Sequence, residues 1–180
     1  VEVEDELARP YAYVARTFGE AGFDLIEMKD PKKSRKLYSW RIENPELHLG
    51  IGGSDGQYFK WKGRYYYAES MQFKQGGPDS DLGAVVFDVT GLPDTTKIRE
   101  VTRIRIIDPS AGLGGFHTLY PYKHSDGRVI LFATSMFGPA QVYDLGRIVD
   151  GGSADPIGRV PNGPEAANKQ GYHDFYVAYD

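Results

Sequence analysis

The chain has 180 residues with 13 Tyr, 9 Phe, 22 Gly and 11 Pro, a composition that favours a domain rich in strands and turns. It has no cysteine, which excludes disulfides and thiolate metal sites. The net charge of −4 argues against a nucleic-acid partner, and no apolar run approaches the roughly 20 residues that a membrane helix needs, so we expect no membrane insertion of this segment.

The first predicted unit covers residues 11–45. Residues 1–10 are too polar and acidic to predict a clear strand. Tyr13–Phe18 and Asp24–Met28 have apolar residues two apart on either side of a glycine-bearing loop, which predicts a β-hairpin. A third strand is predicted over 37–42. The unit therefore lacks an inner strand.

Two complete units follow. In residues 46–107, alternation predicts four strands, at 57–61, 66–71, 85–89 and 98–104. In residues 108–163 it predicts strands at 117–122, 131–136 and 141–145, and a weaker one at 157–160. The last segment, 164–180, contains Tyr172–Asp180, which reads as the inner strand of another unit whose hairpin is missing.

The units share one pattern. Ala15, Ala68 and Ala133 each follow two apolar residues in the first hairpin strand, and a carboxylate stands at the end of the second strand in every copy, namely Glu27, Asp88 and Asp144. Repetition favours a structural role for these carboxylates. Four antiparallel strands in each unit, recurring along the chain, are typical of propeller blades. The sequence predicts an all-β, incomplete β-propeller of about three blades plus an extra inner strand, with the remaining blades in a longer chain.

The hairpins resemble a known repeat. Tyr11–Ala15 followed by Gly22–Pro31 is similar to the LVIVD repeat of bacterial and archaeal β-propellers, with Phe23 and Met28 in place of the usual residues. Residues 85–90 fit well, 142–145 fit in part, and 173–180 is similar to inner strands of that family. The resemblance implies a propeller and an extracytoplasmic location, whether periplasmic, secreted or surface-anchored. It implies no reaction.

Histidines mark the expected mouth of the central channel. His48 precedes a predicted inner strand, and His117 and His173 open two others, so we expect them near the mouth together with Asp55 and Asp174. Neutral imidazoles that converge there can bind a transition metal, for which His117 and His173 are the candidates. The alternative is that each histidine holds a turn. This interpretation is favoured because the second unit has Asp55 or Gly56 where the third has His117, so a ring of histidines around the channel would be interrupted.

Two functions follow from these features. The sequence has no G-x-S-x-G, H-E-x-x-H or C-x-x-C motif, so a non-catalytic module of the cell envelope or exterior is favoured, with a protein, glycan or small molecule as its ligand. No cofactor is evident. The alternative is a metal-dependent propeller enzyme of the oxidase or lyase type, with histidines at the channel mouth.

Overall fold

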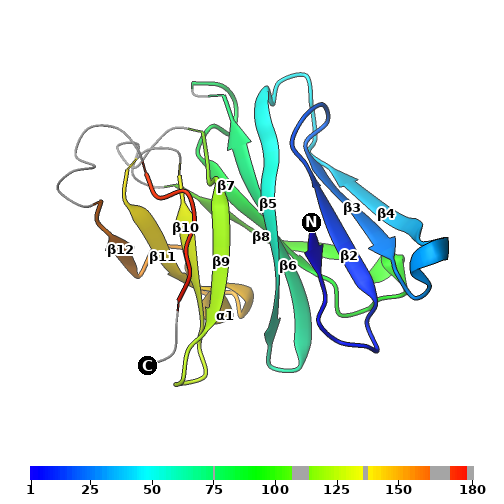
Figure 1. The fold of residues 1–180 in the computed structure, drawn as a ribbon. Helices are drawn as coiled ribbons and strands as arrows, with labels where there is room; N and C mark the ends of the chain where they lie inside the picture. The colour runs from blue at the N-terminus through cyan, green and yellow to red at the C-terminus, as the bar shows by residue number, and fades with distance from the viewer. Residues whose placement is uncertain (75, 107–113, 136–137, 163–170, 178–180) are drawn as a thin grey trace.

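The chain forms three four-stranded antiparallel sheets (Figure 1). The structure is a computed structural model that describes residues 1–74, 76–106, 114–135, 138–162 and 171–177. The first sheet contains β1 (Glu2–Val3), β2 (Tyr11–Arg16), β3 (Gly22–Glu27) and β4 (Arg35–Arg41). The second contains β5 (Gly50–Trp61), β6 (Arg64–Phe73), β7 (Leu82–Asp88) and β8 (Arg99–Arg105). The third contains β9 (Thr118–Lys123), β10 (Val129–Thr134), β11 (Ala140–Asp144) and β12 (Gly158–Val160).

The predicted all-β class is therefore confirmed. Within every sheet the strands are paired in chain order. The first strand of the second sheet, β5, packs beside both β1 and β9, so the first strands of the three sheets lie together (Figure 1). In the described part of the chain, the helices are the short α1 (Leu145–Val149) and 3₁₀ turns at Pro31–Lys33 and Thr95–Lys97. None of them is long and apolar enough to cross a membrane.

The middle sheet is buried on both faces. On β6, Tyr67 points into a core shared with the first sheet, whereas Tyr66 points into a core shared with the third. Every residue of β7 is buried, and its side chains alternate between the same two cores. This arrangement explains why β7 lacks the polar positions of a strand with one solvated face.

The first core contains stacked aromatic rings. The rings of Tyr13 on β2 and Tyr67 on β6 are stacked with their centroids 4.2 Å apart. Phe23 on β3 and Phe87 on β7 meet edge to face at 5.0 Å. Such offset and edge contacts between rings add to the free energy gained by burying their area. The aromatic excess of the sequence is thus used to join neighbouring sheets.

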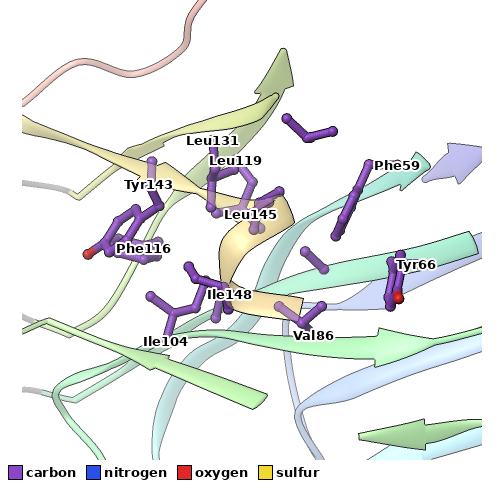
Figure 2. Close-up of a cluster of buried hydrophobic side chains, with 14 of the residues drawn as sticks. Phe59, Tyr66, Val86, Ile104, Phe116, Leu119, Leu131, Tyr143, Leu145 and Ile148 are labelled. Atoms are coloured by element: carbon purple, nitrogen blue, oxygen red, sulfur yellow. The ribbon is translucent and has the colours of Figure 1, made fainter. Parts of the chain in front are cut away.

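The second core includes a helix that the sequence did not predict (Figure 2). Asp144 ends β11 and caps α1, because its carboxylate accepts a hydrogen bond from the backbone N–H of Arg147 at 3.0 Å. Leu145 and Ile148, one turn apart on α1, pack among the core side chains of the second and third sheets. The helix thereby covers apolar surface that a simple turn would leave open.

The first sheet corrects one expectation. The sequence predicts no inner strand in the first unit, but Glu2 pairs with Tyr13 and Val3 with Ala12 to form β1. Glu4 explains why this polar segment is held. Its carboxylate is buried and accepts a hydrogen bond from the Tyr13 hydroxyl at 2.6 Å. A strand of two residues has too little alternation to be recognised from sequence.

The proposed equivalence of Ala15, Ala68 and Ala133 is wrong. Ala15 pairs with Phe23, four residues before Glu27, whereas Ala68 pairs with Val86, two residues before Asp88. Ala133 pairs with Gln141, three residues before Asp144. An odd difference in register turns a side chain to the other face of a sheet, so the alanines are not matching points. The carboxylates do match, since each ends its strand.

The C-terminal segment also differs from its expected form. The sequence predicts a strand over 172–180, but residues 171–177, the described part of it, contain none. The segment nevertheless lies against the third sheet, where the ring of Phe175 is 5.5 Å from that of Phe132 on β10. The Thr118 hydroxyl on β9 donates to the backbone oxygen of His173 at 2.6 Å.

Glycine is required where β5 passes Tyr67. A Cβ placed on Gly56 would lie 1.9 Å from the Tyr67 hydroxyl, and the stacked Tyr67 ring cannot move aside. We expect Gly56→Ala to lower the free energy of unfolding by about 1–3 kcal/mol in urea melts. Gly158→Ala is the matched control, because its Cβ would meet only Val142, at 4.0 Å. Equal stability of the two variants would contradict this packing.

Candidate functional site

The candidate site lies where β5 leaves its regular pairing with β6. The register shifts between Gly53 and Gly56, so Ser54 and Asp55 form a bulge in β5. Bulges redirect side chains and are common next to functional sites. Here the bulge directs Ser54 and Asp55 to the start of β9, because both make hydrogen bonds there.

Asp55 connects the second and third sheets. One carboxylate oxygen accepts a hydrogen bond from the backbone N–H of Leu119 on β9 at 2.9 Å. The other accepts from Gly56 N–H within the bulge at 2.8 Å. The backbone N–H of Asp55 donates to the Ser70 hydroxyl at 2.7 Å. Asp55 therefore belongs to the predicted site but is held by backbone donors, which fixes the bulge against β9.

His117 is the centre of the site. Its Nδ1 lies 3.2 Å from Oε1 of the buried Gln72 and 3.4 Å from the Ser54 hydroxyl. Because the amide oxygen accepts only, Nδ1 carries the proton and Nε2 keeps a lone pair. Burial lowers the pKa of His117, and the neighbouring His173 lowers it further, so the ring is neutral at pH 7.

His173 completes the site from the C-terminal segment. Its exposed side chain meets the His117 ring edge to face, with ring centroids 5.1 Å apart. The structure thus brings together three of the residues predicted for the channel mouth, Asp55, His117 and His173. Ser54 and Gln72 were missed because neither belongs to a motif. The run of glycines from Gly50 to Gly56 was the one available signal, since glycine within a strand often marks a bulge.

His48 and Asp174 have other roles. The His48 ring is buried, with Nε2 2.9 Å from a carboxylate oxygen of Asp79 and Nδ1 3.0 Å from the backbone oxygen of Asn44. Burial alone would lower the pKa of His48, but its hydrogen bonds raise it overall. Both ring nitrogens are therefore used to hold a loop. Asp174 is exposed, and its carboxylate accepts from the N–H of the next residue, Phe175, at 2.7 Å.

A buried acid lies next to the bulge. Glu69 on β6 is fully buried and accepts a hydrogen bond from the Tyr67 hydroxyl, while its Oε1 has no hydrogen-bond partner. A Cβ on Gly53 would lie 2.1 Å from that oxygen, so glycine is needed there. Burial raises the pKa of Glu69 well above its ordinary value of 4.5, and the nearby Asp55 raises it further. The carboxyl is therefore neutral.

The neutral state of Glu69 predicts a pH dependence of stability. A group whose pKa is raised by folding contributes to the free energy of unfolding in full when the pH is below its unfolded-state pKa. That contribution is lost as the pH rises towards its folded-state pKa. Glu69→Gln keeps the shape and removes the titration. We expect the stability of the wild type, relative to Glu69→Gln, to fall above pH 4.5 by up to about 1.4 kcal/mol for each pH unit. Urea melts from pH 4 to pH 8 measure this difference, and a pH-independent difference would show that Glu69 is ionised in the folded protein.

No protein-family model matches this sequence, and no match is found among curated proteins.

Proposed function

We propose that the three sheets are consecutive blades of a β-propeller related to the LVIVD-repeat family. Three observations support this architecture. The strands of each sheet are paired in chain order, the first strands of the three sheets lie together, and the middle sheet packs on both of its faces. Blades of a propeller are related to one another in these three ways.

The outer face of the third sheet supports further blades in a longer chain. Phe132 on β10 pairs with Tyr120 and Val142, and all three are only partly buried. Phe132, Tyr13 and Ala68 occupy equivalent positions, because each pairs with the residue two positions before the carboxylate that ends the next strand. The side chains of Tyr13 and Ala68 are buried between sheets. The third sheet thus has apolar residues at the position where the first and second sheets pack, and Phe175 of the C-terminal segment contacts Phe132 there.

The proposed function of the module is non-catalytic binding at the channel mouth. The observation that carries it is the convergence of Ser54, Gln72, His117 and His173, which come from β5, from β6, from the start of β9 and from the C-terminal segment. Together they offer a neutral imidazole, a second and exposed imidazole, a hydroxyl and an amide. Such a set recognises a polar group of a protein, glycan or small molecule through hydrogen bonds. From the family resemblance, we place this module outside the cytoplasm.

Histidine NMR tests this proposal directly. The imidazole signals of the folded protein are recorded while amides, carboxylates and neutral monosaccharides are added one at a time. We expect at least one class to shift the signals of His117 and His173 together, with His48 and His124 unchanged. His124 is the matched control, because it lies on the exposed β9–β10 turn. If no class moves the His117 signal, or if His124 moves equally, the mouth is not the binding site.

One observation favours a second candidate, a metal-dependent enzyme. Two imidazoles bound to one Zn²⁺ through bonds of about 2.0–2.1 Å have ring centroids about 5 Å apart, and the rings of His117 and His173 are separated by 5.1 Å. With Nδ1 of His117 held by Gln72, its Nε2 is the nitrogen suited to bind a metal. Among the described residues no group of three or more His, Asp or Glu is arranged for a metal, so water or further blades must supply the other ligands.

Calorimetric titration with ZnCl₂ and CuCl₂ decides between the two candidates. The metal-dependent enzyme requires one equivalent of metal that is lost in both His117→Ala and His173→Ala and retained in His124→Ala. If this stoichiometric binding is absent, or if it is lost equally in His124→Ala, the metal-dependent enzyme is excluded and the non-catalytic module is favoured.

A further inference from the structure

The C-terminal segment, residues 171–177, lies on the outer face of the third sheet (Figure 1). We call this segment the strap. The ring of Phe175 lies 5.5 Å from that of Phe132 on β10 and 5.0 Å from that of Tyr172. The Tyr172 hydroxyl donates to the backbone oxygen of Pro161, just after β12, at 2.8 Å. Two aromatic residues therefore anchor the strap to the third sheet.

His173 lies in the chain between these two anchors. Its side chain is exposed, and its ring meets that of His117 edge to face with the centroids 5.1 Å apart. Its backbone oxygen accepts a hydrogen bond from the Thr118 hydroxyl on β9 at 2.6 Å. Both contacts depend on side chains rather than on strand pairing. The position of His173 therefore depends on Thr118 and on the anchors on either side of it, Tyr172 and Phe175.

The strap is attached more weakly than the strands beneath it. In the described part of the chain, no backbone-to-backbone hydrogen bond joins residues 171–177 to the third sheet, whereas β9 and β10 are paired along their whole length. The side chains of His173, Asp174 and Tyr176 are exposed. Segments with few buried contacts open locally at a lower free-energy cost than the sheets they lie on. The strap can therefore leave the third sheet while the three sheets stay folded.

The other half of the candidate site does not depend on the strap. The backbone N–H of His117 donates to the backbone oxygen of Thr134 on β10 at 2.7 Å. Nδ1 of His117 is held by the buried Gln72 of β6, and Ser54 belongs to the bulge in β5. Opening of the strap would remove His173 and leave these three residues in place.

We infer that the strap is a movable part of the candidate site. Phe175 and Thr118 are positioning residues that hold His173 against His117, and the site is complete only while the strap lies on the third sheet. A ligand that contacts both histidines binds the closed state better than the open one, so it holds the strap closed. Binding at the site is thereby coupled to the covering of Phe132. The coupling to a ligand rests on the proposed function, whereas the positioning of His173 does not.

Ring NOEs of the ligand-free folded chain test the positioning. In the wild type we expect cross-peaks between the ring protons of His117 and His173. Phe175→Ala removes the ring that lies on Phe132, so we expect these cross-peaks to be lost. Tyr176→Ala is the matched control and is expected to keep them, because Tyr176 is the next residue of the strap and is 85% exposed.

Two further variants and an internal reference make the result specific. Thr118→Val keeps the shape of the side chain and removes the hydrogen bond to His173, so it is expected to weaken the cross-peaks. Phe175→Leu retains an apolar anchor and is expected to keep part of their intensity. Cross-peaks between Tyr13 and Tyr67 in the first core report that each variant is folded.

Three results would overturn the positioning. The His117–His173 cross-peaks are absent from the wild type, they persist in Phe175→Ala, or they are lost equally in Tyr176→Ala.

A titration separates the strap from the proposed function. Sodium acetate, acetamide and D-glucose are added in turn to the wild type, Phe175→Ala and Tyr176→Ala, and the imidazole signals of His117 are followed. A probe that binds the wild type saturably is expected to bind Phe175→Ala about tenfold more weakly and Tyr176→Ala equally well. Equal binding to Phe175→Ala would show that the strap is no part of the site. If no probe binds the wild type, the proposed function fails, while the cross-peaks still decide whether the strap positions His173.

Discussion

Replacement of Phe87 by alanine is expected to lower the free energy of unfolding by about 3–5 kcal/mol. Phe87 is 1% exposed, and its ring meets Phe23 and Trp40 of the first sheet with centroids 5.0 Å apart in both cases. The variant loses these contacts and leaves a cavity between two sheets that are each held by hydrogen-bonded strands. Such sheets cannot collapse into the space, so the cost is expected in the upper range for an aromatic truncation.

Phe18→Ala is the control for this measurement. Phe18 is 79% exposed in the loop between β2 and β3, so its truncation is expected to change stability by less than about 0.5 kcal/mol. Urea melts of the two variants give the comparison. A loss below about 1 kcal/mol for Phe87→Ala would mean that this face of β7 is not packed against the first sheet.

Replacement of Arg9 by alanine is expected to cost about 3–5 kcal/mol. The Arg9 guanidinium holds the buried Glu4 with two hydrogen bonds and donates to the backbone oxygen of Val89 at 3.0 Å. It also lies 3.9 Å above the Tyr65 ring. Without Arg9, the Glu4 carboxylate remains buried beside Tyr13 with no cation to compensate it. The N-terminal segment would also lose the contacts that Arg9 makes with Val89 and Tyr65 of the second sheet's hairpins.

Two variants separate this effect from a general loss of charge. Arg35→Ala removes the partner of Glu27 at 2.7 Å, but Arg35 is largely exposed, so a cost of about 0–1 kcal/mol is expected. The double variant Glu4→Gln/Arg9→Met removes both buried charges and is expected to recover most of the stability lost in Arg9→Ala. Chemical denaturation measures all three. Equal losses in Arg9→Ala and Arg35→Ala would show that the Glu4–Arg9 pair is accessible to water.

The positions of most strands along the chain could be predicted from the sequence. Alternating apolar residues located the hairpins, and the carboxylates at the ends of β3, β7 and β11 proved to have the structural roles expected from their repetition. Glu27 pairs with Arg35, Asp88 accepts from the backbone N–H of Thr90 at 3.0 Å, and Asp144 caps α1. The register of the alanines could not be predicted in this way. The pairing of each alanine depends on the loop that joins its strand to the next one, which the spacing of one residue type does not encode.

The site was predicted in part. Placing histidines at the starts of inner strands pointed to His117 and His173, but His173 reaches His117 from a segment without a strand, which the Thr118 hydroxyl holds against β9. The same reasoning failed for His48, since its ring is fixed by Asp79, which lies in a loop 31 residues away. Ser54 and Gln72 depend on the bulge in β5. Their roles arise from the contact between two sheets, and the glycines of β5 mark only the bulge, not these contacts.

A two-dimensional NOESY spectrum of the folded chain tests most directly whether the middle sheet is packed between the other two. The structure predicts cross-peaks between the ring protons of Tyr13 and Tyr67, whose centroids are 4.2 Å apart, across the first interface. It also predicts cross-peaks between the Trp61 indole and the α-protons of Gly146, across the second. Both sets together would support three sheets stacked face to face. A well-dispersed spectrum with either set missing would contradict the account.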